Sequence, residues 1–114
     1  MKTPQNIVPY VEILGETMTV ELLLALGGSP VYLADNPQAR SDLARIIGQD
    51  NVRALAQRLG SRSIVRIPIN RPWIAHKLRA GGMPVVEIAR TLHVTDVTVR
   101  AMLSDKGTQL TLPL

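Results

Sequence analysis

The stretch "IARTLHVTDVTVRAML", from Ile88 to Leu103, constrains the fold of this chain more than any other segment. It holds two short apolar patterns of helical spacing, separated by a break near His93. The first pattern already begins before this stretch, at Val85, and repeats at i, i+3, i+4 and i+7, which places its apolar residues on one helix face. The second begins at Thr95, a residue suited to capping a helix N-terminus. We therefore expect two helices at an angle, joined by a tight turn.

A third helix is predicted just before them, in "NRPWIAHKLRA", with Asn70 or Arg71 as its cap and Gly81–Gly82 as its end. Ala89 is small where the last two helices must approach closely. His93 stands where such turns usually carry Gly, and His tolerates the positive φ that this turn requires. A plain helical hairpin matches some of these positions, but the whole set is typical of a helix-turn-helix.

The outward face of the last helix is predicted to lie in the major groove of DNA. Arg donates two hydrogen bonds to guanine, small apolar groups contact thymine methyls, and Asp accepts from cytosine. The predicted base contacts are Thr95, Asp96, Val97, Arg100 and Ala101. Residues around them are candidates for contacts to the DNA backbone, which fix register without reading sequence. These are Arg71, Lys77, Arg79, Arg90 and Ser104.

Composition indicates a mainly helical core. The chain has 114 residues, of which 46% are hydrophobic but only 3% aromatic, with no Phe and no Cys. The core must therefore consist of aliphatic side chains, and disulfides and thiolate metal sites are excluded. The longest apolar run is too short to span a membrane, and the N-terminus lacks the pattern of a signal peptide. We expect a cytoplasmic protein.

The N-terminal part is predicted to begin with a helix over residues 7–14 that ends at Gly15, followed by a second helix in "TMTVELLLALGG". The apolar residues of this second helix point in all directions, so it must be buried on all sides. A partner chain can cover it, although a central position within a monomer is the alternative. The predicted dimer contacts are Met18, Leu22, Leu23, Leu26, Val31 and Leu33.

Two short strands and two more helices complete the N-terminal part. "PVYLA" is a strand candidate, and "SIVRIPIN" alternates as a half-buried strand, which pairs either with the first strand or across a dimer. "DNPQARSDLARIIG" predicts a helix capped by Asp35 or Asn36, and "QDNVRALAQRLG" predicts another, capped by Asp50 or Asn51. The fold class is thus mainly α, with one or two short strands.

The predicted organisation is a dimerisation region over residues 1–69, a helix-turn-helix over 70–106 and a tail over 107–114. Formal net charge is +4, and it is unevenly distributed. Residues 1–39 are acidic, whereas residues 40–66 carry six Arg against two Asp, and residues 71–106 are also basic. An acidic front with a basic rear indicates an assembly region followed by a region that binds a polyanion.

Enzymatic function is not expected. His76 and His93 have no acidic partner at the spacing of a metal site or a catalytic triad, and no Gly-rich phosphate loop follows a strand. Trp73 stands beside Ile74 and is expected in the core. We expect no metal and no cofactor.

Several segments, in this order, resemble the Mor (middle operon regulator) transcription activator family of Mu-like phages and prophages. They are "LLALGGSPVYL", "SIVRIPI" and "HKLRAGGMPVVEIARTLHVTDVTVRAML", within residues 15–104. The resemblance implies a homodimer with two DNA-binding heads that activates a promoter by contacting RNA polymerase. It also implies that the strand region approaches the minor groove, which falls on Ser29 and Tyr32.

The sequence thus predicts a dimeric regulator that binds double-stranded DNA at an inverted repeat, and activation follows from the resemblance alone. The alternative is a phage assembly or DNA-packaging adaptor that uses its helix-turn-helix as an interaction surface.

Overall fold

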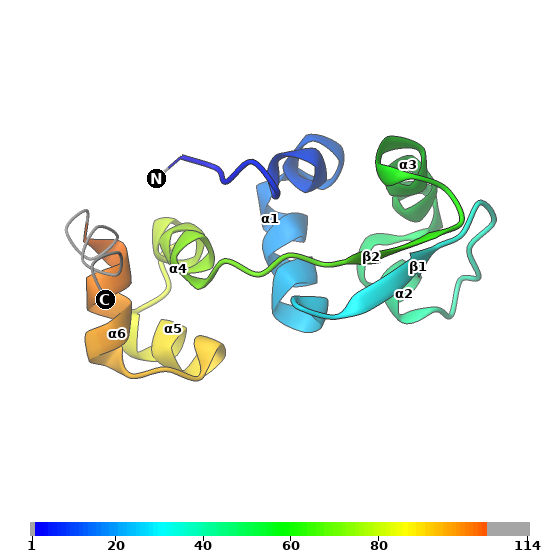
Figure 1. The fold of residues 1–114 in the computed structure, drawn as a ribbon. Coiled ribbons are helices and arrows are strands. Elements are labelled where there is room, and N and C mark those ends of the chain that lie inside the picture. Colours follow the sequence, from blue (N-terminus) through cyan, green and yellow to red (C-terminus); the bar gives the residue numbers. More distant parts are fainter. Residues whose placement is uncertain (1, 105–114) are drawn as a thin grey trace. The chain divides into compact units, whose positions relative to one another are not determined.

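The computed structural model describes residues 2–104 (Figure 1), and the predicted tail over 107–114 lies outside the described residues. The chain divides into two compact units at residues 69 and 70. The first unit contains three helices and two strands: α1 (Val8–Leu26), β1 (Pro30–Leu33), α2 (Asp42–Ile47), α3 (Gln49–Leu59) and β2 (Ser63–Arg66). The second contains three helices: α4 (Arg71–Ala80), α5 (Val85–Leu92) and α6 (Asp96–Leu103). The mainly helical fold class with short strands is confirmed.

Helix α1 contains both predicted N-terminal helices, and Gly15 separates them. Gly15 has φ 80° and ψ 166°, a backbone conformation that interrupts the helix. Residues other than Gly rarely adopt it. The Thr19 hydroxyl, buried one turn later, donates to the Gly15 carbonyl at 2.7 Å. The helix ends at the predicted glycine pair, where the N–H of Gly27 donates to the Leu23 carbonyl.

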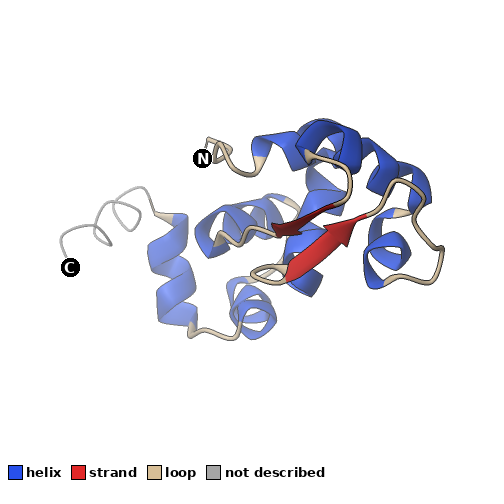
Figure 2. Ribbon diagram, turned by 45° about the vertical axis from the view of Figure 1, so that its right-hand side comes forward, coloured by secondary structure: helices blue, strands red, loops and turns tan. Residues whose placement is uncertain are grey.

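The two strands pair with each other within the chain, as an antiparallel sheet in which Tyr32 stands opposite Ile64 (Figure 2). The sequence left open whether the strands pair with each other or across a dimer, and the structure has them paired with each other. Leu33 is buried and Val65 half-buried, while Tyr32 and Ile64 are 57% and 72% exposed. The sheet therefore keeps one face in the core and exposes an apolar pair on the other.

The start of α2 differs from the prediction. The helix begins at Asp42 rather than near Asp35, and its cap is Ser41, whose hydroxyl accepts from the N–H of Ala44 at 3.2 Å. Asp35 instead pairs with Arg62, 2.7 Å away beside the β2 strand. Because the helix starts seven residues after Asp35 and its cap is Ser41, the predicted caps Asp35 and Asn36 are wrong.

The cap of α3 is also corrected. Gly48, at φ 86°, occupies the N-cap position and provides no side chain. Asp50 lies in the first turn and pairs with Arg53 at 2.8 Å, and the Asn51 amide donates to the Ile47 carbonyl. The break between α2 and α3 is a single glycine, so Asp50 and Asn51 are already inside the helix.

The core of the first unit includes much of the predicted dimer contact. Leu22, Leu23 and Leu33 are buried in the single chain, with Val52 and Leu55 of α3. Because the chain itself covers these three leucines, they are not available to a partner, and the alternative of a helix buried within the single chain holds for Leu22 and Leu23. The remaining predicted contacts are half-buried: Met18, Leu26 and Val31.

Within residues 2–104, no helix combines the length and the apolar character that crossing a membrane requires.

Candidate nucleic-acid interface

The last three helices form the predicted helix-turn-helix, and the turn geometry supports this assignment. Helices α5 and α6 are joined at His93, which has φ 59° and ψ 44°, the left-handed conformation expected there. The N–H of Val94 donates to the Ala89 carbonyl, and that of His93 to the Arg90 carbonyl. This pair of bonds is the Schellman arrangement, which satisfies the last carbonyls of a helix and turns the chain sharply.

The ends of the three helices follow local signals that the sequence contains. Asn70 caps α4 by accepting from the N–H of Trp73 at 3.0 Å, and Thr95 caps α6 by accepting from the N–H of Thr98 at 3.1 Å. Pro84, predicted in the first turn of α5, stands instead at its N-cap in an extended conformation, so the helix begins at Val85. These caps fix where α6 begins and hence which of its residues face outward.

The inner faces of the helices form an apolar core. Ile88, Ala89 and Leu92 of α5 are buried, as are Trp73 and Ile74 of α4 and Val99 of α6. Met102 and Leu103 are half-buried at the end of α6. The small side chain of Ala89 lies in this core, as close approach of two helices requires.

The opposite face of α6 is exposed. Val97 is 68% exposed, and Thr95, Arg100 and Ala101 are also exposed, whereas Val99 between them is fully buried. The structure thus brings the predicted base-contacting residues to one helix face. The Thr95 hydroxyl accepts the capping bond and shares a second hydrogen bond, of 2.9 Å, with the Thr98 hydroxyl, so most of its hydrogen-bonding capacity is used within the helix end.

Asp96 and Arg100 are not independent residues on this face. Arg100 Nη1 donates to Asp96 Oδ2 at 2.6 Å, one helical turn away. Hydrogen bonding and charge interaction with Arg100 hold the pKa of the Asp96 carboxyl below its usual value. Sequence reasoning assigned each side chain its own base and missed the pair, although the four-residue spacing of acid and base is a readable signal.

The predicted backbone contacts are distributed around α4, α5 and the end of α6. Arg71, Arg79 and Arg90 are exposed. Arg79 donates to the Met83 carbonyl at 3.2 Å, and Lys77 is half-buried, its ammonium 5.7 Å from the centre of the Trp73 ring. The Ser104 hydroxyl donates to the Ala101 carbonyl at 3.2 Å.

Three arginines of the first unit form ion pairs with acids, which lowers the positive charge expected for residues 40–66. Arg53, Arg58 and Arg62 pair with Asp50, Glu12 and Asp35 at 2.8, 3.0 and 2.7 Å. All three pairs are solvent-exposed, so they contribute little to stability but neutralise charge locally. The basic character of residues 40–66 is therefore weaker than their composition indicates.

Comparison of the chain with protein-family models, curated proteins and solved structures found no match.

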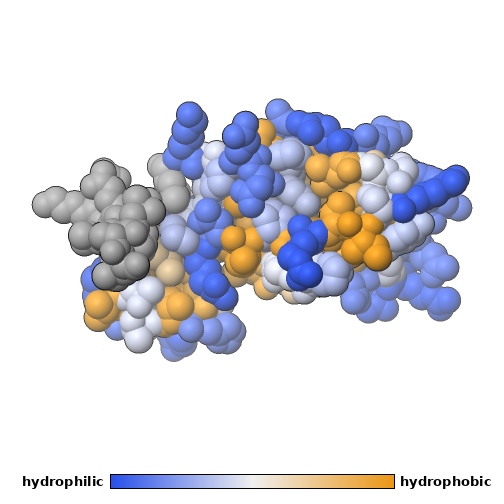
Figure 3. All heavy atoms as spheres, viewed as in Figure 1, coloured by the Kyte–Doolittle hydropathy of each residue, from blue (hydrophilic) through white to orange (hydrophobic). Residues whose placement is uncertain are grey.

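The resemblance assigned Ser29 and Tyr32 to the minor groove, and the structure exposes Tyr32 but leaves Ser29 half-buried. Tyr32 is exposed on the outer face of the sheet, where Figure 3 shows hydrophobic atoms over the two strands. Ser29 is half-buried, and its backbone carbonyl accepts from the N–H of Ile67 at 2.9 Å. Ser29 and Tyr32 belong to the first unit, and the α6 face belongs to the second.

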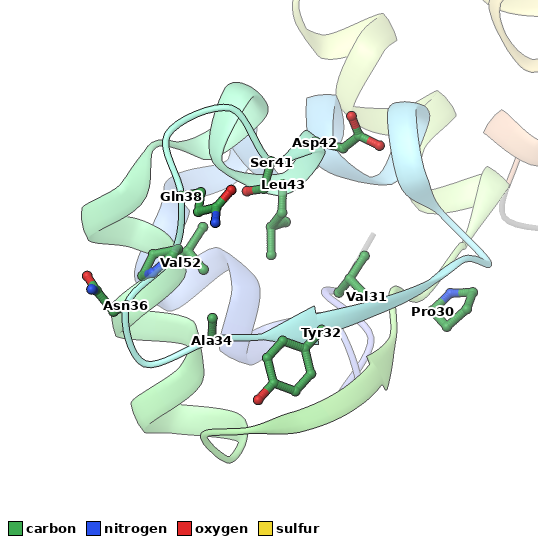
Figure 4. Close-up of a pocket in the computed structure, with 11 residues that line it drawn as sticks. Pro30, Val31, Tyr32, Ala34, Asn36, Gln38, Ser41, Asp42, Leu43 and Val52 are labelled. Atoms are coloured by element: carbon green, nitrogen blue, oxygen red, sulfur yellow. The ribbon is translucent and has the colours of Figure 1, made fainter.

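A groove of about 480 Å³ lies between β1 and the loop before α2 (Figure 4). Val31, Leu43 and Val52 give it apolar walls, and Asp42 is the only carboxylate in its lining. It brings no pair of charged groups together. Among the described residues, no three His, Cys, Asp or Glu side chains are grouped in a way that could hold a metal ion.

Proposed function

We propose that this chain is a sequence-specific DNA-binding transcription regulator that acts as a homodimer on an inverted repeat. One observation carries the proposal: the exposed face of α6, where Val97 and Arg100 point away from the core of a helix-turn-helix. An exposed valine beside a cation suits the major groove, where thymine presents a methyl group and guanine two acceptors.

Charge supports the same surface. Residues 70–104 carry five Lys or Arg side chains against two acids, Glu87 and Asp96. A net positive helix-turn-helix attracts the phosphate backbone before any base is read. The exposed Arg71 and Arg90 are suited to these contacts. The homodimer, the activating role and the contact with RNA polymerase are supported by the resemblance to the Mor family, as is action in the bacterial cytoplasm at a phage or prophage promoter.

The test is a selection of bound sites from random duplex DNA, followed by titrations of the preferred site and of a shuffled site at several salt concentrations. We expect an inverted repeat, with half-sites about one helical turn or a whole multiple apart. The log–log slope of affinity against salt should exceed a magnitude of about 4 for a dimer with several phosphate contacts per head. No selectivity and a flat salt response would contradict the proposal and favour the adaptor function.

Arg100→Ala and Arg53→Ala form a matched pair for the same assay, because both arginines are exposed in part and paired with an acid on their own helix. Arg100→Ala should weaken the preferred site roughly 5- to 150-fold and the shuffled site much less, as expected for a base contact. Arg53→Ala should leave the ratio between the two sites unchanged. Equal losses on both sites for Arg100→Ala would reduce it to a phosphate contact.

The homodimer needs a contact surface that the single chain leaves open. Leu23→Asp would unfold the chain, because Leu23 is buried in its core. Ile64→Asp changes an exposed residue instead, so the fold should persist. Sedimentation of the wild type at micromolar concentration should give about twice 12.5 kDa, and Ile64→Asp should give the single mass. A monomeric wild type would refute the dimer, and an unchanged mass for Ile64→Asp with weaker DNA binding would assign this face to the minor groove.

A further inference from the structure

The ion pair on the exposed face of α6 goes beyond the assignment of Asp96 and Arg100 as two separate contacts. The two side chains are 46% and 60% exposed, and their charged groups are 2.6 Å apart. Neither is needed to cover the core, because Val99 and the half-buried Met102 do so from the other face. The pair therefore occupies the surface that the proposed function directs at DNA.

Asp96 is held in place from two directions. It is the first residue of α6, where the helix dipole favours an anion. Arg100 provides the second hold by donating from Nη1. The carboxylate is thus a fixed acceptor at the start of the helix.

A fixed acceptor restricts the arginine that binds it. An unpaired Arg side chain samples many rotamers, and ordering it on a base costs conformational entropy. The bond to Asp96 directs the guanidinium toward the N-terminal end of α6, the end that enters the major groove in helix-turn-helix proteins. Only part of the five N–H donors of the guanidinium is used in this bond. The remaining donors suffice for the two acceptors of guanine, O6 and N7.

We propose that Asp96 is a positioning residue that orients Arg100 for a guanine in the major groove and contacts no base itself. This inference rests on the proposed function. It replaces the expectation that Asp96 accepts from cytosine, since Arg100 already occupies that carboxylate. The negative charge of Asp96 also repels the phosphates of any DNA, so binding depends more on the contact that Arg100 makes with a guanine.

The experiment measures discrimination at one atom. The preferred site is compared with the same site carrying 7-deazaguanine at the guanine on which Arg100→Ala has its effect, which removes the N7 acceptor and keeps base pairing. The full-length wild type is compared with Asp96→Asn, Asp96→Glu, Arg100→Ala and the double variant of Asp96→Asn with Arg100→Ala. Asp50→Asn is the matched control, because Asp50 also lies in a first helical turn and pairs with an arginine on its own helix.

Asp96→Asn should lower the discrimination against 7-deazaguanine about two- to fivefold, the range expected for an exposed ion pair. Asp96→Glu should keep the discrimination of the wild type, because Glu also reaches an Arg four residues later. The double variant should discriminate no better and no worse than Arg100→Ala, since Asp96 acts through Arg100. Asp50→Asn should leave discrimination unchanged, although it alters net charge by the same amount.

The positioning role would be overturned if Asp96→Asn changed the affinity for the guanine site and for the 7-deazaguanine site by the same factor. It would also be overturned if the double variant lost discrimination equal to the sum of the two single losses. If the wild type is selective and Arg100→Ala loses selectivity while Asp96→Asn keeps it, this inference fails and the proposed function stands. If the wild type does not distinguish its selected site from shuffled DNA, both fail together.

Discussion

Val97 and Val99 allow the same chemical change to be made on opposite faces of one helix. Val97 is 68% exposed and Val99 is fully buried, two residues further along α6. Replacing each by Ala removes the same two carbon atoms. Val99→Ala should therefore destabilise the fold and leave the DNA contact intact, whereas Val97→Ala should do the reverse.

The magnitudes follow from burial. Two carbons removed from a fully buried site, at about 0.8 kcal/mol each, cost about 1.6 kcal/mol of unfolding free energy, before any cavity effect. For a cooperatively unfolding chain of about 100 residues the melting temperature should fall by roughly 6–13 °C. Val97 buries less than a third of its surface, so the same change costs at most about 0.5 kcal/mol. The better helix propensity of Ala offsets most of this loss.

The assays are thermal unfolding followed by circular dichroism and titration of the selected DNA site well below the melting temperature. Val97→Ala should weaken the selected site, with its largest effect at a thymine, since a methyl contact is lost. Val99→Ala should bind like the wild type while folded. If Val97→Ala destabilises the chain as much as Val99→Ala, or if both variants bind DNA equally well, then α6 does not present Val97 to DNA and Val99 to the core.

Three further predictions test the fold itself. His93→Gly should change the unfolding free energy by less than about 1 kcal/mol, because relief of the left-handed conformation offsets the entropy of Gly, whereas His93→Ile should lower it by about 1–2 kcal/mol in urea titrations. Ser41→Ala should cost about 1 kcal/mol in the same titrations, since it removes the side-chain cap of α2. The pKa of Asp35 is lowered from its usual 3.8 by hydrogen bonds from Arg62 and then Ser61, so its contribution is complete above that value and is lost as pH falls through the lower pKa of the folded state. Urea midpoints measured from about pH 5 downward should thus fall less steeply for Asp35→Asn than for the wild type.

Local signals in the sequence were sufficient for most of the helix-turn-helix. Asn70 and Thr95 cap their helices as predicted, and His93 adopts the positive φ that its place in the turn required. The apolar spacing of α5 identified the buried residues Ile88 and Leu92. These features depend on residues within one or two turns of each other, so a sequence pattern contains the physical information that determines them.

Features that depend on distant residues were decided only by the tertiary structure. The residue predicted to cap α2, Asp35, instead pairs with Arg62, 27 positions along the chain, and no local pattern predicts that contact. The burial of Leu23 depends on how the helices of the first unit pack around α1, and an apolar sequence alone does not tell whether the same chain or a second one covers it.

On the surface of α6, some features were determined by the sequence and others by the tertiary structure. The sequence by itself determined which side chains stand on the outer face, because helical periodicity fixes their directions. That Arg100 turns back onto Asp96 depends on the rotamers that the two side chains adopt in the folded unit. Spacing permits such a pair, but only the packed structure selects it, since its net free energy is small compared with the packing that sets the backbone beneath it.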